Sequence, residues 1–279
     1  MTVLLYFLNV ACATGRSALE KQSAKTNTGA TVFNLNKTLS GLAVFLVWGL
    51  VQGFSLHGPT LALGLCYGLF LCISMHTGFR ALALGPMALT SIIASFSLLV
   101  PFFFGIFFWK EPLTLFGGCG ILLLLLSIVL INGKKTKGIT LRWFLYALAT
   151  LLTNGACSVI QKYHQMQFPT LYRNEFMVAA LLTVSLLLFA TQLVKPSRQP
   201  QFFSLCGLGL LSGILNGAAN YIVLYLSATE NASVLFPIVS VANIVAVWLV
   251  GLLFFKEKLT LLQSIGLILG IFSVFLLKM

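Results

Sequence analysis

The sequence predicts an all-α membrane protein with ten transmembrane helices, arranged as two inverted five-helix repeats. Three observations lead to this prediction. Hydrophobic residues make up 59% of the chain and charged residues only 8%, and the mean hydropathy is +1.01. The apolar residues form ten segments, each about as long as a helix that crosses a bilayer. A short motif at the end of the fourth segment returns at the end of the ninth.

The composition excludes an ordinary soluble domain, because soluble domains carry roughly 25% charged residues. Lys and Arg number 17 against 5 acidic residues, which gives a net charge of +12. In a soluble protein this balance would suggest nucleic acid. Here the basic residues lie singly or in short groups between apolar segments, so we expect them to orient the chain in a membrane. No nucleic-acid partner is expected.

The ten predicted segments follow one another with short connections. They cover about residues 2–22, 30–52, 59–80, 86–109, 113–132, 141–162, 171–193, 203–226, 232–255 and 261–278. Segments this long and continuous are expected to be helices, because a bilayer offers no partner for an open backbone. The alternating strands of about ten residues that are typical of a membrane β-barrel do not appear.

The repeated motif spans Phe108–Thr114 and returns, 146 positions later, as Phe254–Thr260. Further residues match at nearly the same offset: Gly64 with Gly209, Gly68 with Gly213, Gly105 with Gly251, Gly120 with Gly266 and Ser127 with Ser273. The sequence therefore predicts two five-helix repeats, residues 1–135 and 136–279. Because five is odd, the second repeat must enter the membrane from the opposite side, which makes the repeat inverted.

Orientation follows from the Lys and Arg count. Odd-numbered connections hold thirteen of these residues, whereas even-numbered connections and the C-terminus hold four. We therefore expect a multi-pass protein of the plasma (inner) membrane, with odd connections in the cytoplasm and both termini outside. Three single cations in or near the segments, Arg16, Lys37 and Arg80, are expected to reach towards the headgroups.

Glycines at four-residue spacing lie on the third segment (Gly64, Gly68) and on the eighth (Gly209, Gly213, Gly217). This spacing places them on one helix face and lets two backbones approach closely, so both helices are predicted to be tightly packed. The two Lys-Glu pairs, Lys110-Glu111 and Lys256-Glu257, are expected to end helices and to pair locally at the surface.

Polar side chains inside the segments are the candidate site, because such groups are costly in a bilayer and usually face the bundle interior. The candidate solute-binding residues are Asn9, His76, Asn154, Asn216, Asn220, Tyr221, Ser240 and Asn243. The same amides and hydroxyls could instead cross-link helices at about 0.6 kcal/mol each. Pro101 and Pro237 are expected to loosen their helices and to free carbonyl groups.

Several kinds of chemistry are not supported. The chain has no Asp, and its five Glu residues lie at or near segment ends, so a buried carboxylate that carries protons is not expected. His76, Glu20 and Glu175 are weaker candidates for coupling. No phosphate-binding loop, nucleophile elbow or zinc-binding pair is present. We therefore expect no enzyme, no cofactor and no metal.

The ten segments, the inverted repeat and the Lys-Glu-x-Leu-Thr turn between the fourth and fifth helices of each copy resemble the drug/metabolite transporter superfamily, EamA type. Residues 79–86 and 224–228 are similar to that family's link between the third and fourth helices of each copy. The resemblance implies a carrier with a central cavity lined mainly by spans one, three, four, six, eight and nine. The family's Trp-Gly in the first helix is missing here, so only its Asn role carries over, to Asn9. Some related transporters keep both termini in the cytosol, opposite to the charge count.

The sequence thus predicts a secondary transporter that exports or imports a small polar or amphipathic metabolite, such as an amino acid, a nucleoside or a drug-like compound. Alternating access would move the solute through a central cavity between the two repeats. The expected partners are the solute and membrane lipid, and the protein is expected to be a monomer or a homodimer. A non-transporting membrane scaffold remains the alternative. A membrane enzyme is a third possibility that lacks a nucleophile or metal cluster in the sequence.

Overall fold

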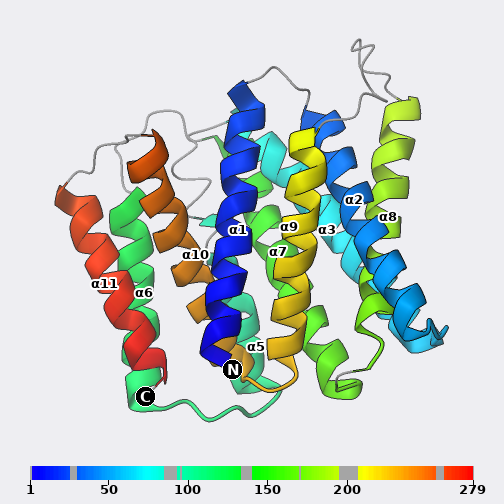
Figure 1. Cartoon of the computed structure of the whole chain (residues 1–279). Helices are drawn as coiled ribbons and strands as arrows, with labels where there is room; N and C mark the ends of the chain where they lie inside the picture. The colour runs from blue at the N-terminus through cyan, green and yellow to red at the C-terminus, as the bar shows by residue number, and fades with distance from the viewer. Residues whose placement is uncertain are drawn as a thin grey trace. The chain divides into compact units, whose positions relative to one another are not determined.

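The computed structural model describes residues 2–25, 30–84, 93–94, 96–132, 140–169, 171–194, 207–255 and 261–278. These residues form helices and connections, and no strand occurs among them. The helices are α1 (Thr2–Lys25), α2 (Ala30–Gln52), α3 (Gly58–Leu84), η1 (Phe96–Leu98), α5 (Leu99–Phe107), α6 (Leu115–Asn132), α7 (Leu141–Gln167), α8 (Arg173–Val194), α9 (Gly207–Ser227), α10 (Ala232–Phe255) and α11 (Leu261–Lys278). Figure 1 shows this succession of helices along the chain.

Six helices in the described part of the chain are long and apolar enough to cross a membrane. Their apolar stretches are Thr2–Leu19, Phe33–Val51, Gly58–Gly78, Leu141–Gln167, Arg173–Ala190 and Gly207–Ser227. Shorter apolar helical stretches lie in η1–α5, α6 and α10. The all-helical class is therefore confirmed for the described residues, while the number of ten spans stays a prediction.

The chain forms two compact units, and each draws on both predicted repeats. The first unit comprises Met1–Cys72 and Tyr163–Ala228, and the second comprises Ile73–Lys162 and Thr229–Met279. The boundary between the units passes through α3 and α7, so each of these helices has one end in the first unit and the other end in the second. The predicted division into residues 1–135 and 136–279 concerns sequence repeats rather than packing, and it stays a prediction.

In the first unit, α1 packs on α9, and α2 packs on both α8 and α9 (Figure 1). The predicted close approach of glycine-bearing helices is confirmed there. A Cβ atom added at Gly68 of α3 would lie 2.5 Å from the carbonyl oxygen of Ala180 on α8. A Cβ atom added at Gly213 of α9 would collide with Ser40 and with the backbone of Lys37 on α2. Only glycine lets these backbones meet.

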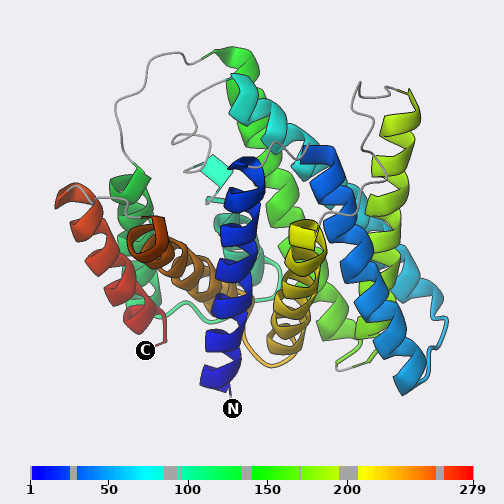
Figure 2. The same ribbon diagram turned by 45° about the horizontal axis from the view of Figure 1, so that its top comes forward.

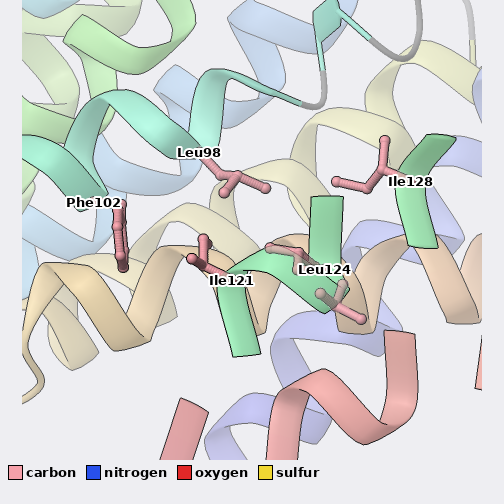
Figure 3. Close-up of a cluster of buried hydrophobic side chains, with 6 residues drawn as sticks. Leu98, Phe102, Ile121, Leu124 and Ile128 are labelled. Carbon is pink, nitrogen blue, oxygen red and sulfur yellow. The ribbon is translucent and has the colours of Figure 1, made fainter. Parts of the chain in front are cut away.

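In the second unit, α6 and α11 lie side by side, and α10 packs on α5 and α11 (Figure 2). A core cluster fills the space between η1, α5, α6 and α10; its buried members are Leu98, Phe102, Ile121, Leu124, Ile128 and Val241 (Figure 3). Ser127 of α6 donates a hydrogen bond of 2.6 Å to the carbonyl oxygen of Gly266 on α11. This contact joins the last helix of one predicted repeat to the last helix of the other.

The first Lys-Glu motif ends a helix, as predicted, but its carboxylate does not pair locally. Lys110 adopts a left-handed backbone conformation (φ 53°), which turns the chain between α5 and α6. The Glu111 carboxylate then accepts hydrogen bonds of 2.8 Å from the backbone N–H groups of Ala232 and Ser233. It caps the positive N-terminal end of α10, 121 residues away. The second motif, at residues 256–260, lies outside the described residues.

Candidate functional site

The predicted site residues of the first unit meet where α1 contacts α9. Asn9 of α1 is only 1% exposed, and its Nδ2 donates a hydrogen bond of 2.8 Å to the carbonyl oxygen of Ala219. Its Oδ1 is buried without a hydrogen-bond partner among the described residues. An unpaired buried amide oxygen is costly, so this atom is an acceptor available to a bound group.

Asn216 and Asn220 follow one another by one turn on α9. Nδ2 of Asn220 donates to the backbone oxygen of Asn216 over 2.9 Å, and Oδ1 of Asn216 accepts from Nη1 of Arg16 over 2.8 Å. Arg16 thus differs from the headgroup anchor that we expected, because its guanidinium binds a side chain on a neighbouring helix. Tyr221 follows on α9, half-buried, with its ring centroid 6.2 Å from that of Phe45.

In the second unit, Asn154 lies where α7 contacts α3. Its Oδ1 accepts a hydrogen bond of 2.7 Å from Oγ of Ser74. One turn away on each helix, Thr150 donates to Thr77 over 2.9 Å. Three buried hydroxyl groups and one half-buried amide therefore follow the contact between these two helices.

The Asn9 and Asn154 contacts join equivalent positions of the two predicted repeats. Asn9 and Asn154 are 145 residues apart, since 154 − 9 = 145, and so are their partners Ser74 and Ala219, since 219 − 74 = 145. In one unit the first helix of the first repeat binds the third helix of the second repeat. In the other unit the first helix of the second repeat binds the third helix of the first.

The remaining predicted residues, His76, Ser240 and Asn243, also lie in the second unit. His76 lies on α3 and is exposed. Ser240 and Asn243 are half-buried on α10, a turn apart, and Oδ1 of Asn243 has no hydrogen-bond partner in the described part of the chain. Pro237 lies inside the same helix and prevents one backbone hydrogen bond there.

A second polar cluster, which the sequence analysis missed, lies in the first unit. It connects His57, Thr60 at the start of α3, His164 and Gln165 near the end of α7, and Arg173 at the start of α8. In the Lys and Arg count, Arg173 is one of the four charges of the even-numbered connections and C-terminus, and the sequence predicts no other role for it. The sequence signal was the cation beside an apolar segment, but nothing in the pattern indicated that the segment ends would fold together around it.

A further buried cation lies in the second unit. Lys162 of α7 is buried, and its amine donates a hydrogen bond to the carbonyl oxygen of Glu230 in the connection before α10. Within the described residues, no group of three His, Cys, Asp or Glu side chains could hold a metal ion.

No family model and no curated protein matches the chain. A solved structure described as "Crystal structure of protein" has a TM-score of 0.79 with this chain, and the match covers 99% of this chain and 95% of that one. The two sequences are 19% identical. At this identity the similarity shows a shared fold and carries no information on function.

Proposed function

We propose that the protein is a multi-pass secondary transporter of the plasma (inner) membrane, with ten spans in two inverted repeats, as in the EamA-type drug/metabolite transporters that its sequence resembles. Its solute is a small polar or amphipathic metabolite. Six helices in the described part of the chain that are long and apolar enough to cross a membrane support the membrane-embedded part of this proposal.

The observation that carries the proposal is a pair of hydrogen bonds between equivalent positions: the Asn9 amide donates to the carbonyl oxygen of Ala219, and the Asn154 amide accepts from the Ser74 hydroxyl. Amides on membrane-spanning helices are costly and usually face the interior of the helix bundle, where they can bind a solute. Contacts between equivalent positions, with the two repeats exchanged, fit a carrier in which two related halves alternate between conformations.

The residues of the α1–α9 contact have complementary roles in this proposal. Oδ1 of Asn9 supplies an acceptor without a protein partner among the described residues. The Arg16–Asn216 hydrogen bond supplies a cation held in place by an amide. Asn220 and Tyr221 lie on the next turn of α9 and offer further polar groups to a solute. The equivalent contact at Asn154 would serve the other conformation.

Replacement of Asn220 by Leu tests this assignment. We expect the variant to reach the membrane at the wild-type level but to lose solute transport in proteoliposomes, because an apolar side chain cannot replace the amide. Gln167→Leu is the matched control, since Gln167 is an exposed amide at the end of α7. Unchanged uptake and efflux in Asn220→Leu would remove this residue from the site.

The solute itself is best sought by a thermal-shift screen of purified protein against a metabolite library. A compound that binds the folded protein raises its melting temperature. A hit would then be tested as a transported solute in proteoliposomes.

A membrane scaffold is the second candidate, and one observation favours it. The side chains of Asn9, Asn154 and Asn216 each bind another helix, as cross-linking residues do. A scaffold would show no flux of any thermal-shift hit across a proteoliposome membrane. If one of these compounds instead accumulates inside proteoliposomes above its equilibrium concentration, a purely structural role is excluded.

A further inference from the structure

One buried chain of hydrogen bonds ends at a guanidinium. Nδ1 of His57 lies 3.1 Å from Oγ1 of Thr60, and the same oxygen lies 3.2 Å from Nε2 of His164. Nδ1 of His164 lies 2.9 Å from Nε2 of Gln165. Nε of Arg173 then donates to Oε1 of Gln165 over 2.9 Å. Thr60, His164 and Gln165 are fully buried.

Arg173 fixes the direction of the hydrogen bonds between itself, Gln165, His164 and Thr60. A guanidinium can only donate, so Gln165 must present its oxygen to Arg173 and its NH2 group to His164. Nδ1 of His164 is then an acceptor, and Nε2 carries the hydrogen that is donated to Thr60. Thr60 has two acceptor positions and one hydrogen, so its hydrogen bond with Nδ1 of His57 can run in either direction. His164 is therefore neutral in this arrangement, and the chain supplies no negative charge to Arg173.

Arg173 itself is 8% exposed, and its guanidinium carbon lies 4.7 Å from the ring centroid of Tyr225. Its Nη2 is buried without a hydrogen-bond partner among the described residues. Glu175 follows two residues later on α8. Its carboxylate instead accepts a hydrogen bond of 3.0 Å from the backbone N–H of Ser55. A cation this deeply buried normally requires a counter-charge, because the loss of hydration strongly disfavours the charged form.

We propose that Arg173 binds an anion, a carboxylate or a small inorganic ion, through its terminal nitrogens. On the guanidinium of Arg173, Nε already binds Gln165, and one planar face is covered by the ring of Tyr225. The edge with Nη1 and Nη2 remains, and this edge can bind a carboxylate with two parallel hydrogen bonds. α8 begins at Arg173, so the positive end of that helix adds to the attraction. Because Nη2 is covered here, the anion enters when the surrounding helix ends separate.

Two sources of such an anion are possible, and they lead to different experiments. If it is the carboxylate of the transported solute, the inference rests on the proposed function and names its substrate class, organic anions and amino acids. If it is an inorganic ion such as chloride, Arg173 forms a structural or regulatory site that does not depend on transport.

The test measures the melting temperature of the purified full-length protein at constant ionic strength, set with a bulky sulfonate salt. Acetate, its neutral analogue acetamide and chloride are titrated separately. We expect a saturable rise of about 2–5 °C at ten times the dissociation constant with at least one of the two anions and none with acetamide. Arg173→Gln should lose the rise, whereas Arg142→Gln, at an exposed arginine of α7, should keep it.

The outcomes separate the possibilities. A rise with acetate that Arg173→Gln abolishes supports the carboxylate site, and a rise with chloride alone supports an inorganic anion and overturns the substrate assignment. If Arg173→Gln does not fold, Arg173→Lys, which keeps the charge without the two-pronged edge, should bind acetate at least tenfold more weakly. Absence of a saturable rise in the wild-type protein, or an equal rise in Arg173→Gln, overturns the proposal. If acetate binds at Arg173 but no solute crosses the membrane of proteoliposomes, the proposed transport function is rejected and the anion-binding site is kept.

Discussion

Substitution of Gly68 by Ala tests the packing of α3 against α8. The added Cβ would lie 2.5 Å from the carbonyl oxygen of Ala180 and 2.7 Å from Cβ of Thr183. Carbon atoms pack best at about 3.5–4.0 Å, so the two helices must separate by roughly 1 Å. The obstacle is the backbone of α8 and the branched carbon of Thr183, and a change of rotamer moves neither away.

The expected cost combines two opposite effects. Overpacking of this kind costs about 1–3 kcal/mol. Replacement of Gly by Ala in a helix recovers about 0.8–1 kcal/mol of helix propensity. Gly118→Ala in α6 isolates the second effect, because a Cβ atom there would meet nothing within 4 Å. We therefore expect Gly68→Ala to be less stable than Gly118→Ala by about 1–3 kcal/mol.

The assay is thermal unfolding of purified protein in detergent, followed by tryptophan fluorescence. Gly68→Ala should melt below the wild-type protein, and Gly118→Ala at or slightly above it. Equal melting temperatures for the two variants would refute the close approach of α3 and α8. Gly213→Ala, at the equivalent glycine of α9, should behave like Gly68→Ala, because its Cβ would meet the backbone of α2.

Three further predictions concern polar contacts. Glu111→Ala should destabilise the protein by about 0.5–2 kcal/mol, measured by thermal unfolding, because the N-terminal N–H groups of α10 lose their acceptor. Ser127→Ala should lower the free energy of unfolding by about 0.6 kcal/mol, the average for a hydrogen bond between membrane helices, because the bond to Gly266 is lost. Thr60→Val should cost more, about 1–3 kcal/mol, since it leaves a buried donor of His164 unpaired; thermal unfolding measures this as well.

Matched changes serve as controls for the variants at Glu111 and Thr60. Lys110→Ala removes the exposed neighbour of Glu111 and should leave stability nearly unchanged. Thr153→Val in α7 removes only hydrogen bonds to carbonyl groups of its own helix, so it should cost less than Thr60→Val. If Thr60→Val is as stable as the wild-type protein, the hydrogen-bond chain to Arg173 does not hold the helix ends together.

Much of the helical structure could be predicted from the sequence. Long apolar segments in a chain with so few charges have no stable alternative to helices in a bilayer, and helices occur at most of the predicted segments in the described residues. The glycine spacing on the third and eighth segments also predicted close packing correctly, because a four-residue interval places small residues on one helix face regardless of the partner.

The candidate site could be predicted only in part. Asn9, Asn216 and Asn220 were chosen because amides are rare in apolar helices, and the structure places them at one helix contact. Arg16 and Arg173 were misjudged, because the sequence does not reveal whether a cation near a segment end reaches towards water or turns inwards. That choice depends on which neutral acceptors neighbouring helices present, here Asn216 and Gln165.

By itself, the sequence determined that this chain forms apolar helices, carries a recurring motif and places amides on particular helix faces, because these properties depend on local composition and spacing. Only the tertiary structure decided which helices meet. It joined α1 to α9 and α3 to α7, brought Glu111 to the start of α10, and surrounded Arg173 with neutral groups. Contacts between residues more than a hundred positions apart depend on how side chains of different helices fit together, and no local pattern encodes that fit.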